Sequence, residues 1–235
     1  VHLGSPHGGV GFARGLDWLA SRPPVRLVIL GDLFEYWLES SAAVARHAVV
    51  LERLRQLRDR GWHIELVRGN REMVAGRRLE IAGGLRLHRR LDLLVGGRRL
   101  RVVHGDRLCH DPGYRALAAL MASFWQRAWQ ALHPPVMQDV VARWMRRRSR
   151  GNRPMTGRRI FIDPRRVVAS SRGCDHLIAG HVHQAWTRVV RGCPLTLVGD
   201  WPGSSGHTRS VVTPPSTSRR WAMAASRLRL AWLTA

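Results

Sequence analysis

Five short apolar runs, each followed by a glycine beside a polar residue, constrain the fold of this chain more than any other feature. The runs are residues 25–30, 64–67, 100–103, 177–179 and 195–198. Runs of this length and composition are typical of buried strands. Between the first two, residues 41–60 carry apolar side chains at helical spacing before Gly61, which predicts a β-α-β unit. We therefore expect an α/β fold in which polar strand ends meet at one edge and form a site there.

The composition is that of a globular chain with a large excess of positive charge. A content of 45% hydrophobic and 23% charged residues in 235 positions suits one core. The 39 basic residues are all arginine and face 16 acidic ones, which favours polyanionic partners, although a lysine-free composition is also typical of a GC-rich gene. No apolar stretch approaches the roughly 18 residues of a membrane span. Three cysteines without a C-x-x-C pair indicate a reducing compartment, so we expect a cytoplasmic protein.

The pattern also predicts how the chain is divided. Residues 114–132 and 136–148 have the pattern of two helices separated by two prolines. We expect this insertion, about 114–152, to form a helical flap over the site of a single domain at 1–201. Residues 202–235 contain no acidic residue and are rich in Ser, Thr, Pro and Gly, so we expect a disordered or loosely attached tail.

Six side chains at strand ends or in adjoining loops offer nitrogen or oxygen donors. They are His2, Asp32, Asn70, His104, His181 and His183. A set without thiolates suits Mn²⁺, Fe²⁺ or Zn²⁺, and six donors are too many for one closed tetrahedral site. Two metals fit better, because a carboxylate can bridge two ions roughly 3.5–4 Å apart that together clamp a phosphoryl group. Asp32 is the best candidate for the bridge.

The same motifs resemble a known family. The ordered set is His2-Leu3-Gly4, Gly31-Asp32-Leu33-Phe34-Glu35, Gly69-Asn70-Arg71-Glu72, His104-Gly105-Asp106 and Gly180-His181-Val182-His183. It resembles the motif series of the calcineurin-like metallophosphoesterases. Over residues 1–201 the chain is most similar to the bacterial UDP-2,3-diacylglucosamine pyrophosphohydrolases of lipid A synthesis, since Arg71 follows Gly69-Asn70 and Gly199-Asp200-Trp201 closes the last strand. The resemblance implies a layered αββα sandwich with a helical insertion.

The resemblance also implies roles for individual residues. His2, His183 and Asp32 would hold one metal, and Asp32, Asn70, His104 and His181 the other. Both ions are expected to be Mn²⁺, with Fe²⁺ or Zn²⁺ as alternatives. Arg71 would contact the diphosphate and act in catalysis with Asp32 and His104. The expected substrate contacts are Asn70, Arg71, Asp111, Tyr114, Ser149, Asn152 and His181.

The implied reaction splits the pyrophosphate of UDP-2,3-diacylglucosamine into UMP and 2,3-diacylglucosamine 1-phosphate. The expected partners are this nucleotide-linked glycolipid and the cytoplasmic face of the inner membrane, bound peripherally, because residues 114–152 supply apolar side chains for the acyl chains and an arginine run for headgroups. Nucleic acid is not an expected partner.

Departures from the family pattern keep other functions open. The family opens with Asp-x-His, and Val1 takes the x position, so we expect an upstream segment to supply that carboxylate. The alternative is an impaired or inactive member kept for binding. Glu35 and Glu72 stand where the family has Asp, which would alter how the metal ligands are oriented. Two other functions remain as alternatives. One is a metallophosphoesterase that acts on another nucleotide or on a nucleic-acid phosphodiester, and the other is a basic nucleic-acid-binding protein without catalysis.

Overall fold

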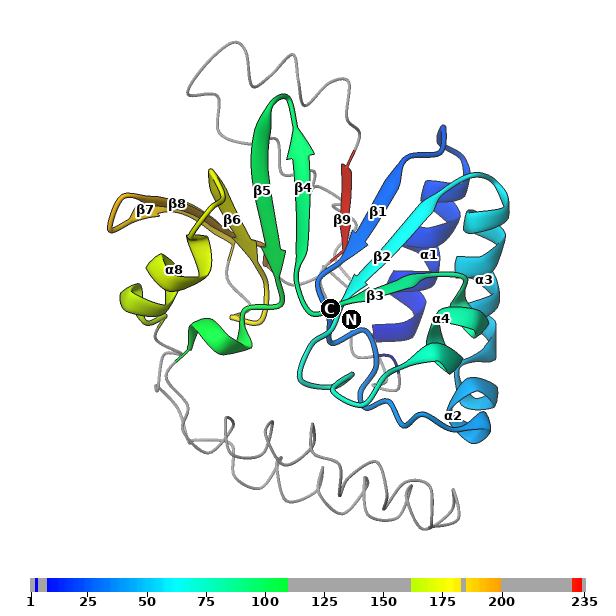
Figure 1. Ribbon diagram of the computed structural model, residues 1–235. Helices are drawn as coiled ribbons and strands as arrows, with labels where there is room; N and C mark the ends of the chain where they lie inside the picture. The colour runs from blue at the N-terminus through cyan, green and yellow to red at the C-terminus, as the bar shows by residue number, and fades with distance from the viewer. Residues whose placement is uncertain (1–2, 4–7, 110–161, 183–184, 200–229, 234–235) are drawn as a thin grey trace.

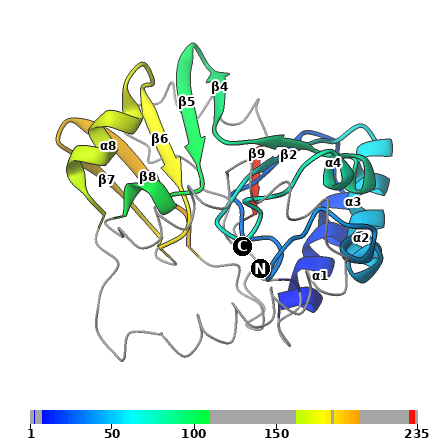
Figure 2. The same cartoon turned by 60° about the horizontal axis from the view of Figure 1, so that its bottom comes forward.

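Two β-sheets lie face to face in the computed structural model, with helices on the outer face of each sheet (Figure 1). The structure describes residues 3, 8–109, 162–182, 185–199 and 230–233. A second view shows the helices of the first sheet and the helix of the second on opposite sides of the molecule (Figure 2). Among the described helices, none is long and apolar enough to cross a membrane.

The first sheet is parallel throughout and has the strand order β3-β2-β1-β9. Its strands are β1 (Arg26–Ile29), β2 (His63–Val67), β3 (Arg86–His88) and β9 (Leu230–Leu233). The helices that accompany it are α1 (Gly8–Ala20), α2 (Ser41–Arg46), α3 (Ala48–Asp59) and α4 (Arg77–Gly83). The parallel pairing of β1 with β2 across α2 and α3 confirms the predicted β-α-β unit.

One helix was predicted over residues 41–60, and this is wrong, because the structure has two helices that meet at His47. The backbone of His47 has φ −109° and ψ 16°, outside the helical region. Its ring lies 4.7 Å from the ring of Phe34 and 6.2 Å from that of Trp37, between centroids. This long-range packing outweighs the local helical preference. The predicted stop is confirmed at Gly61, which has φ +94° and donates its N–H to Arg58 O at 2.8 Å.

The second sheet is mixed and has the strand order β4-β5-β6-β8-β7. Its strands are β4 (Leu91–Val95), β5 (Arg98–Val103), β6 (His176–Ala179), β7 (Trp186–Val190) and β8 (Cys193–Leu197). The three central strands are parallel and both edge strands are antiparallel to them. A short 3₁₀ helix, η1 (Asp106–Leu108), follows β5, and α8 (Pro164–Ser171) packs on the outer face, capped by the Asp163 carboxylate.

Alternating side chains of β1 and of Leu30, which follows it, belong to two different cores. Leu27 and Ile29 pack with the helices of the first sheet, whereas Val28 and Leu30 pack against residues of the second sheet such as Val102. A third cluster, which includes Val167, lies between the second sheet and α8. Three apolar layers between four layers of structure confirm the αββα sandwich expected from the sequence.

A helical insertion and a loosely attached tail were predicted from the sequence pattern and composition. The insertion at about 114–152 lies outside the described residues, and so do residues 202–229. Four residues of the expected tail, Leu230–Leu233, form β9 and pair in parallel with β1, so that Leu27 lies opposite Ala231. Backbone hydrogen bonds to an edge strand make few demands on sequence, which is why composition alone gave no sign of this pairing.

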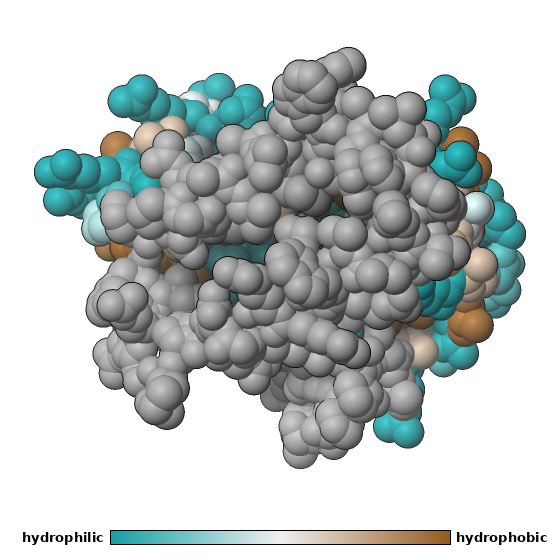
Figure 3. All heavy atoms as spheres, turned by 90° about the horizontal axis from the view of Figure 1, so that it is seen from below, coloured by the Kyte–Doolittle hydropathy of each residue, from teal (hydrophilic) through white to brown (hydrophobic). Residues whose placement is uncertain are grey.

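The polar strand ends meet at one end of the molecule. The central strands of both sheets point toward the lower end in Figure 1. Figure 3 looks onto this end, where hydrophilic surface of described residues shows at the centre. The carboxyl ends of β1, β2, β5 and β6 therefore deliver their polar residues to a common place.

Candidate metal centre

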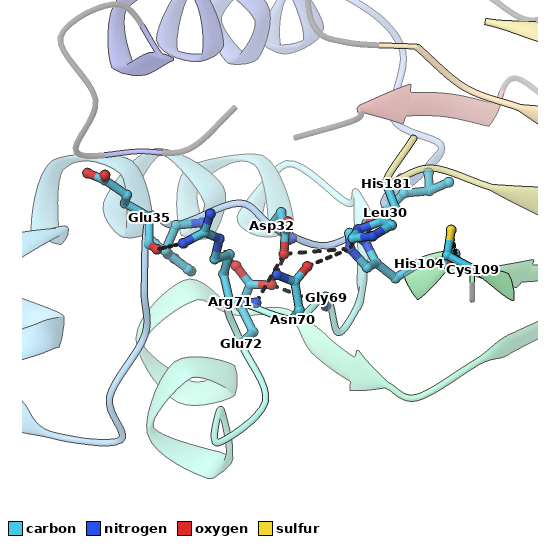
Figure 4. A network of polar contacts seen from close by, with 12 residues as sticks. Leu30, Asp32, Glu35, Gly69, Asn70, Arg71, Glu72, His104, Cys109 and His181 are labelled. Atoms are coloured by element: carbon cyan, nitrogen blue, oxygen red, sulfur yellow. Dashed lines mark hydrogen bonds and ion pairs between the residues drawn. The ribbon is translucent and has the colours of Figure 1, made fainter. Parts of the chain in front are cut away.

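Four strand ends bring Asp32, Asn70, His104 and His181 together (Figure 4). The Nε2 atom of His104 lies 3.1 Å from the side-chain oxygen of Asn70 and 3.1 Å from Nδ1 of His181. The same atom lies 3.6 Å from Oδ1 of Asp32. One donor atom from each of Asp32, His104 and His181 falls within 4.8 Å of the others. The structure thus gathers the four residues assigned to the second metal around one point.

The protonation of His104 suits a cation at that point. Its Nδ1 atom bonds to the backbone carbonyl oxygen of Leu30, and a carbonyl only accepts, so Nδ1 carries the proton. In the neutral form of the ring Nε2 is then the bare nitrogen, and it is the atom that faces the other donors. His104 is 3% exposed and Asp32 5%, so water does little to solvate these groups. A bare imidazole nitrogen, a carboxylate and a second imidazole fit a divalent ion of the Mn²⁺ to Zn²⁺ series.

Asn70 completes the group through its amide. When the amide nitrogen faces Asp32, it lies 3.0 and 2.9 Å from the two carboxylate oxygens. When the amide oxygen faces the common point instead, it supplies a neutral oxygen donor beside His104. Both orientations keep the side chain within the group, because the position of Asn70 is set by the end of β2.

Two of these residues have strained backbones. Asp32 has φ +50° and His181 has φ +68°, and the only other described non-glycine residue with positive φ is Arg191. A left-handed conformation at a residue with a side chain costs on the order of 1–3 kcal/mol and persists where the surroundings enforce it. At a strand end it turns the side chain out of the sheet and toward the site.

The glycines of the motifs allow the strand ends to approach one another. A Cβ atom on Gly31 would lie 2.7 Å from Gly69 Cα and 2.7 Å from Nδ1 of His104, closer than atoms can pack. Gly31 also has φ +80°, and Gly105 has φ +114°, both favourable only for glycine. A Cβ atom on Gly105 would lie 2.9 Å from Gly180 O. Glycine at positions 31, 69 and 105 is therefore a requirement for bringing the donors together.

The buried carboxylate of Glu72 joins two of the loops. It accepts the backbone N–H groups of Asp32 at 2.8 Å, Phe34 at 3.0 Å and Gly69 at 3.2 Å. Burial, followed by the charge of Asp32, raises the pKa of Glu72 to about 7, against the opposing effect of these hydrogen bonds. The sequence pointed to Glu72 only as a replacement for Asp, because two of its three partners, Asp32 and Phe34, come from a distant segment and leave no local signal.

Arg71 lies beside the centre and is only lightly held. Its backbone N–H donates to Oδ1 of Asp32 at 3.0 Å. Its guanidinium lies on the side toward Glu35, where Nη1 donates to the Glu35 carbonyl oxygen at 3.4 Å (Figure 4). The Nε atom is buried and makes no hydrogen bond within the described part of the chain. The guanidinium therefore keeps most of its donors for an anion.

The remaining predicted site residues lie outside the described residues. They are His2, Asp111, Tyr114, Ser149, Asn152 and His183. Of the ligands expected for the first metal, Asp32 alone is described.

Comparisons with known proteins agree with this chemistry. The chain is 31% identical over 185 residues to the UDP-2,3-diacylglucosamine hydrolase of Pseudomonas putida, covering 74% of this chain and 77% of that protein. It is 32% identical over 187 residues to that of Aeromonas salmonicida, covering 74% and 72%. With the hydrolase of Nitrosococcus oceani the identity is 30% over 213 residues, covering 86% and 84%. No protein-family model matches the chain. A solved archaeal phosphodiesterase covers 81% of the chain at 12% identity with a TM-score of 0.37, a likeness too distant to bear on function.

Proposed function

This chain belongs to the family of UDP-2,3-diacylglucosamine hydrolases, and on that premise we propose that it hydrolyses the pyrophosphate of UDP-2,3-diacylglucosamine to UMP and 2,3-diacylglucosamine 1-phosphate. The observation that supports this most strongly is the meeting of Asp32, Asn70, His104 and His181 around the bare Nε2 atom of His104. Membership of the family indicates that the reaction is a hydrolysis, and the substrate is proposed from the names of the relatives.

The donor set supports a pair of divalent ions, for which we propose Mn²⁺. Asp32, Asn70, His104 and His181 would hold one ion, and Asp32 with His2 and His183 the other. When bound, such a pair supplies a water of lowered pKa and positive charge for the phosphoryl oxygens. Asp32 is suited to be shared because a carboxylate offers two oxygens, of which only Oδ1 accepts the Arg71 N–H.

The protein itself orients these groups. The Leu30 carbonyl oxygen fixes the His104 ring, and the Glu72 carboxylate fixes the backbone of Asp32 in its left-handed conformation. Arg71 is tied to Asp32 through its backbone N–H, and its permanently charged, planar guanidinium matches two phosphate oxygens at once. We assign it the contact with the diphosphate.

The parts of the substrate other than the diphosphate are proposed to contact residues outside the described ranges. Asp111, Tyr114, Ser149 and Asn152 are proposed to contact the sugar and the nucleotide. Because the substrate carries two acyl chains, the proposal includes peripheral contact with the inner membrane from the cytoplasmic side.

Release of UMP tests the proposal directly. The full chain loaded with Mn²⁺ is expected to convert UDP-2,3-diacylglucosamine to equal amounts of UMP and the sugar 1-phosphate, and EDTA is expected to stop it. His104→Ala should abolish the release, while Arg14→Gln, an exposed change on α1, should leave it unaltered. Hydrolysis of bis(p-nitrophenyl) phosphate without any UMP release would mean that the substrate is another phosphodiester.

A further inference from the structure

A cavity of about 290 Å³ shares a wall with the candidate metal centre. His104 and Gly69 line it on the side of the centre, and Met73 and Leu108 add apolar surface. Its positive charge comes from arginines of four separate segments. These are Arg68 after β2, Arg89 and Arg90 between β3 and β4, Arg101 on β5, and Arg107 on η1.

Two of these arginines are already committed within the fold. The guanidinium of Arg101 donates to the two oxygens of Asp92 at 2.6 and 3.0 Å and to the carbonyl oxygens of Ser170 and Arg172 at 2.8 and 2.9 Å. Arg90 approaches the same carboxylate, with its Nε 3.5 Å from Oδ2. Arg101 therefore forms a wall of the cavity rather than a free binding group.

The other three carry charge without a partner carboxylate in the described ranges. No ion pair there involves Arg68, Arg89 or Arg107. The Nε atom of Arg68 is buried and makes no hydrogen bond among the described residues. Asp106 is the one carboxylate among the described lining residues.

We infer that this cavity is an oxyanion subsite that takes a phosphomonoester group next to the metal centre. Arg68, Arg89 and Arg107 line the cavity without an ion-pair partner among the described residues, and guanidinium forks match phosphate oxygens. The volume is at the lower end of the roughly 300–1,000 Å³ of small-molecule sites, so the cavity suits a phosphate group rather than a whole nucleotide.

The identity of the natural occupant rests on the proposed function, because both proposed products are phosphomonoesters. Each carries a dianionic phosphate that forms beside His104, within reach of the shared wall. The subsite would hold that phosphate after cleavage and so delay product release. Phosphate binding itself does not depend on the metals, since none of the three arginines is a metal donor.

Phosphate binding to the full chain tests the subsite with and without the metals. Inorganic phosphate, UMP and uridine are titrated by calorimetry into protein treated with EDTA and into protein loaded with Mn²⁺. We expect phosphate and UMP to bind in both states and uridine in neither. Arg89→Gln and Arg107→Gln, both at exposed positions, should each weaken phosphate binding about tenfold, because each removes a charge-assisted hydrogen bond. Arg68→Gln should also weaken phosphate binding about tenfold. The unfolding temperature of this variant is measured first, and it should equal that of the unaltered protein.

Arg14→Gln is the matched control, since it removes one guanidinium from an exposed position on α1. It should change phosphate binding by less than about twofold, because a surface charge far from the ligand is screened. The inference is overturned by absence of phosphate binding in EDTA, by unchanged binding in Arg89→Gln and Arg107→Gln, or by equal weakening in Arg14→Gln. Loss of UMP release with intact phosphate binding would contradict the proposed function alone.

Discussion

The carboxylate of Glu72 accepts the backbone N–H of Asp32 at 2.8 Å, across 40 positions of sequence. The same carboxylate holds Phe34 on one loop and Gly69 on the other. Asp32 has a left-handed backbone, which is unfavourable by itself. The buried acid therefore stabilises the conformation that turns the Asp32 side chain toward His104.

Replacing this acid tests its role. Glu72→Gln at pH 8, where the carboxyl is largely ionised, should lower the free energy of unfolding by about 1–3 kcal/mol, because the amide nitrogen cannot accept an N–H and leaves a buried donor unpaired. Urea unfolding measures the change. Glu52→Gln on the exposed face of α3 is the control and should cost no more than about 0.5 kcal/mol. Equal loss in both variants would mean that the three hydrogen bonds do not stabilise the loops.

Metal content distinguishes a shared ligand from one that serves a single ion. Asp32→Ala should lose most of the bound Mn²⁺, because both proposed ions depend on its carboxylate. Asn70→Ala should lose less, because its amide serves one ion only. Elemental analysis of the purified full chains after dialysis measures this. Equal metal content in Asp32→Ala and the unaltered protein would contradict the assignment of Asp32 as the bridge.

The lowered pKa of His47 predicts how the free energy of unfolding varies with pH. Burial, and then the charge of Arg46, lower the pKa of His47 from 6.5 to about 4. The unfolded chain therefore takes up the proton first as the pH falls, so the contribution to stability is complete above pH 6.5 and is lost toward pH 4.

Substituting His47 should reduce that slope. Urea unfolding of His47→Gln and of the unaltered protein at pH 7, 5.5 and 4.5 gives the difference in slope, and carboxyl groups common to both proteins cancel. The same pH dependence in both would show that the ring between Phe34 and Trp37 is not kept neutral by its surroundings.

Arg101 should contribute more to stability than its partner Asp92. Arg101→Gln gives up two bonds to Asp92 and two to the carbonyl oxygens of Ser170 and Arg172 at the end of α8, at an expected cost of about 1–3 kcal/mol. Asp92→Asn should cost less, because its side chain is 44% exposed and the bonds to the carbonyl oxygens survive. Urea unfolding of the two variants compares them, and a larger cost for Asp92→Asn would refute this order.

Several features of the fold could be predicted from the sequence because they follow from neighbouring residues. The five apolar runs coincide with β1, β2, β5, β6 and β8, since burial on both faces of a strand requires a continuous apolar run. Glycine beside each polar residue marked the strand ends, because no other residue allows Gly31 and Gly69 to approach so closely. The gathering of Asp32, Asn70, His104 and His181 follows from strand ends meeting at one edge.

Other features depend on residues far apart in the chain and were decided by the tertiary structure. The helix breaks at His47 because its ring packs on Phe34 and Trp37, and no residue nearby would end a helix there. The pairing of β9 with β1 uses backbone groups, which leave no trace in side-chain pattern. The roles proposed for His2, His183, Asp111, Tyr114, Ser149 and Asn152 stay predictions. The sequence by itself determined which donors stand at which strand ends, because that information is local. Only the tertiary structure decided how they face one another, because Glu72 and the Leu30 carbonyl oxygen orient Asp32 and His104 across long stretches of chain.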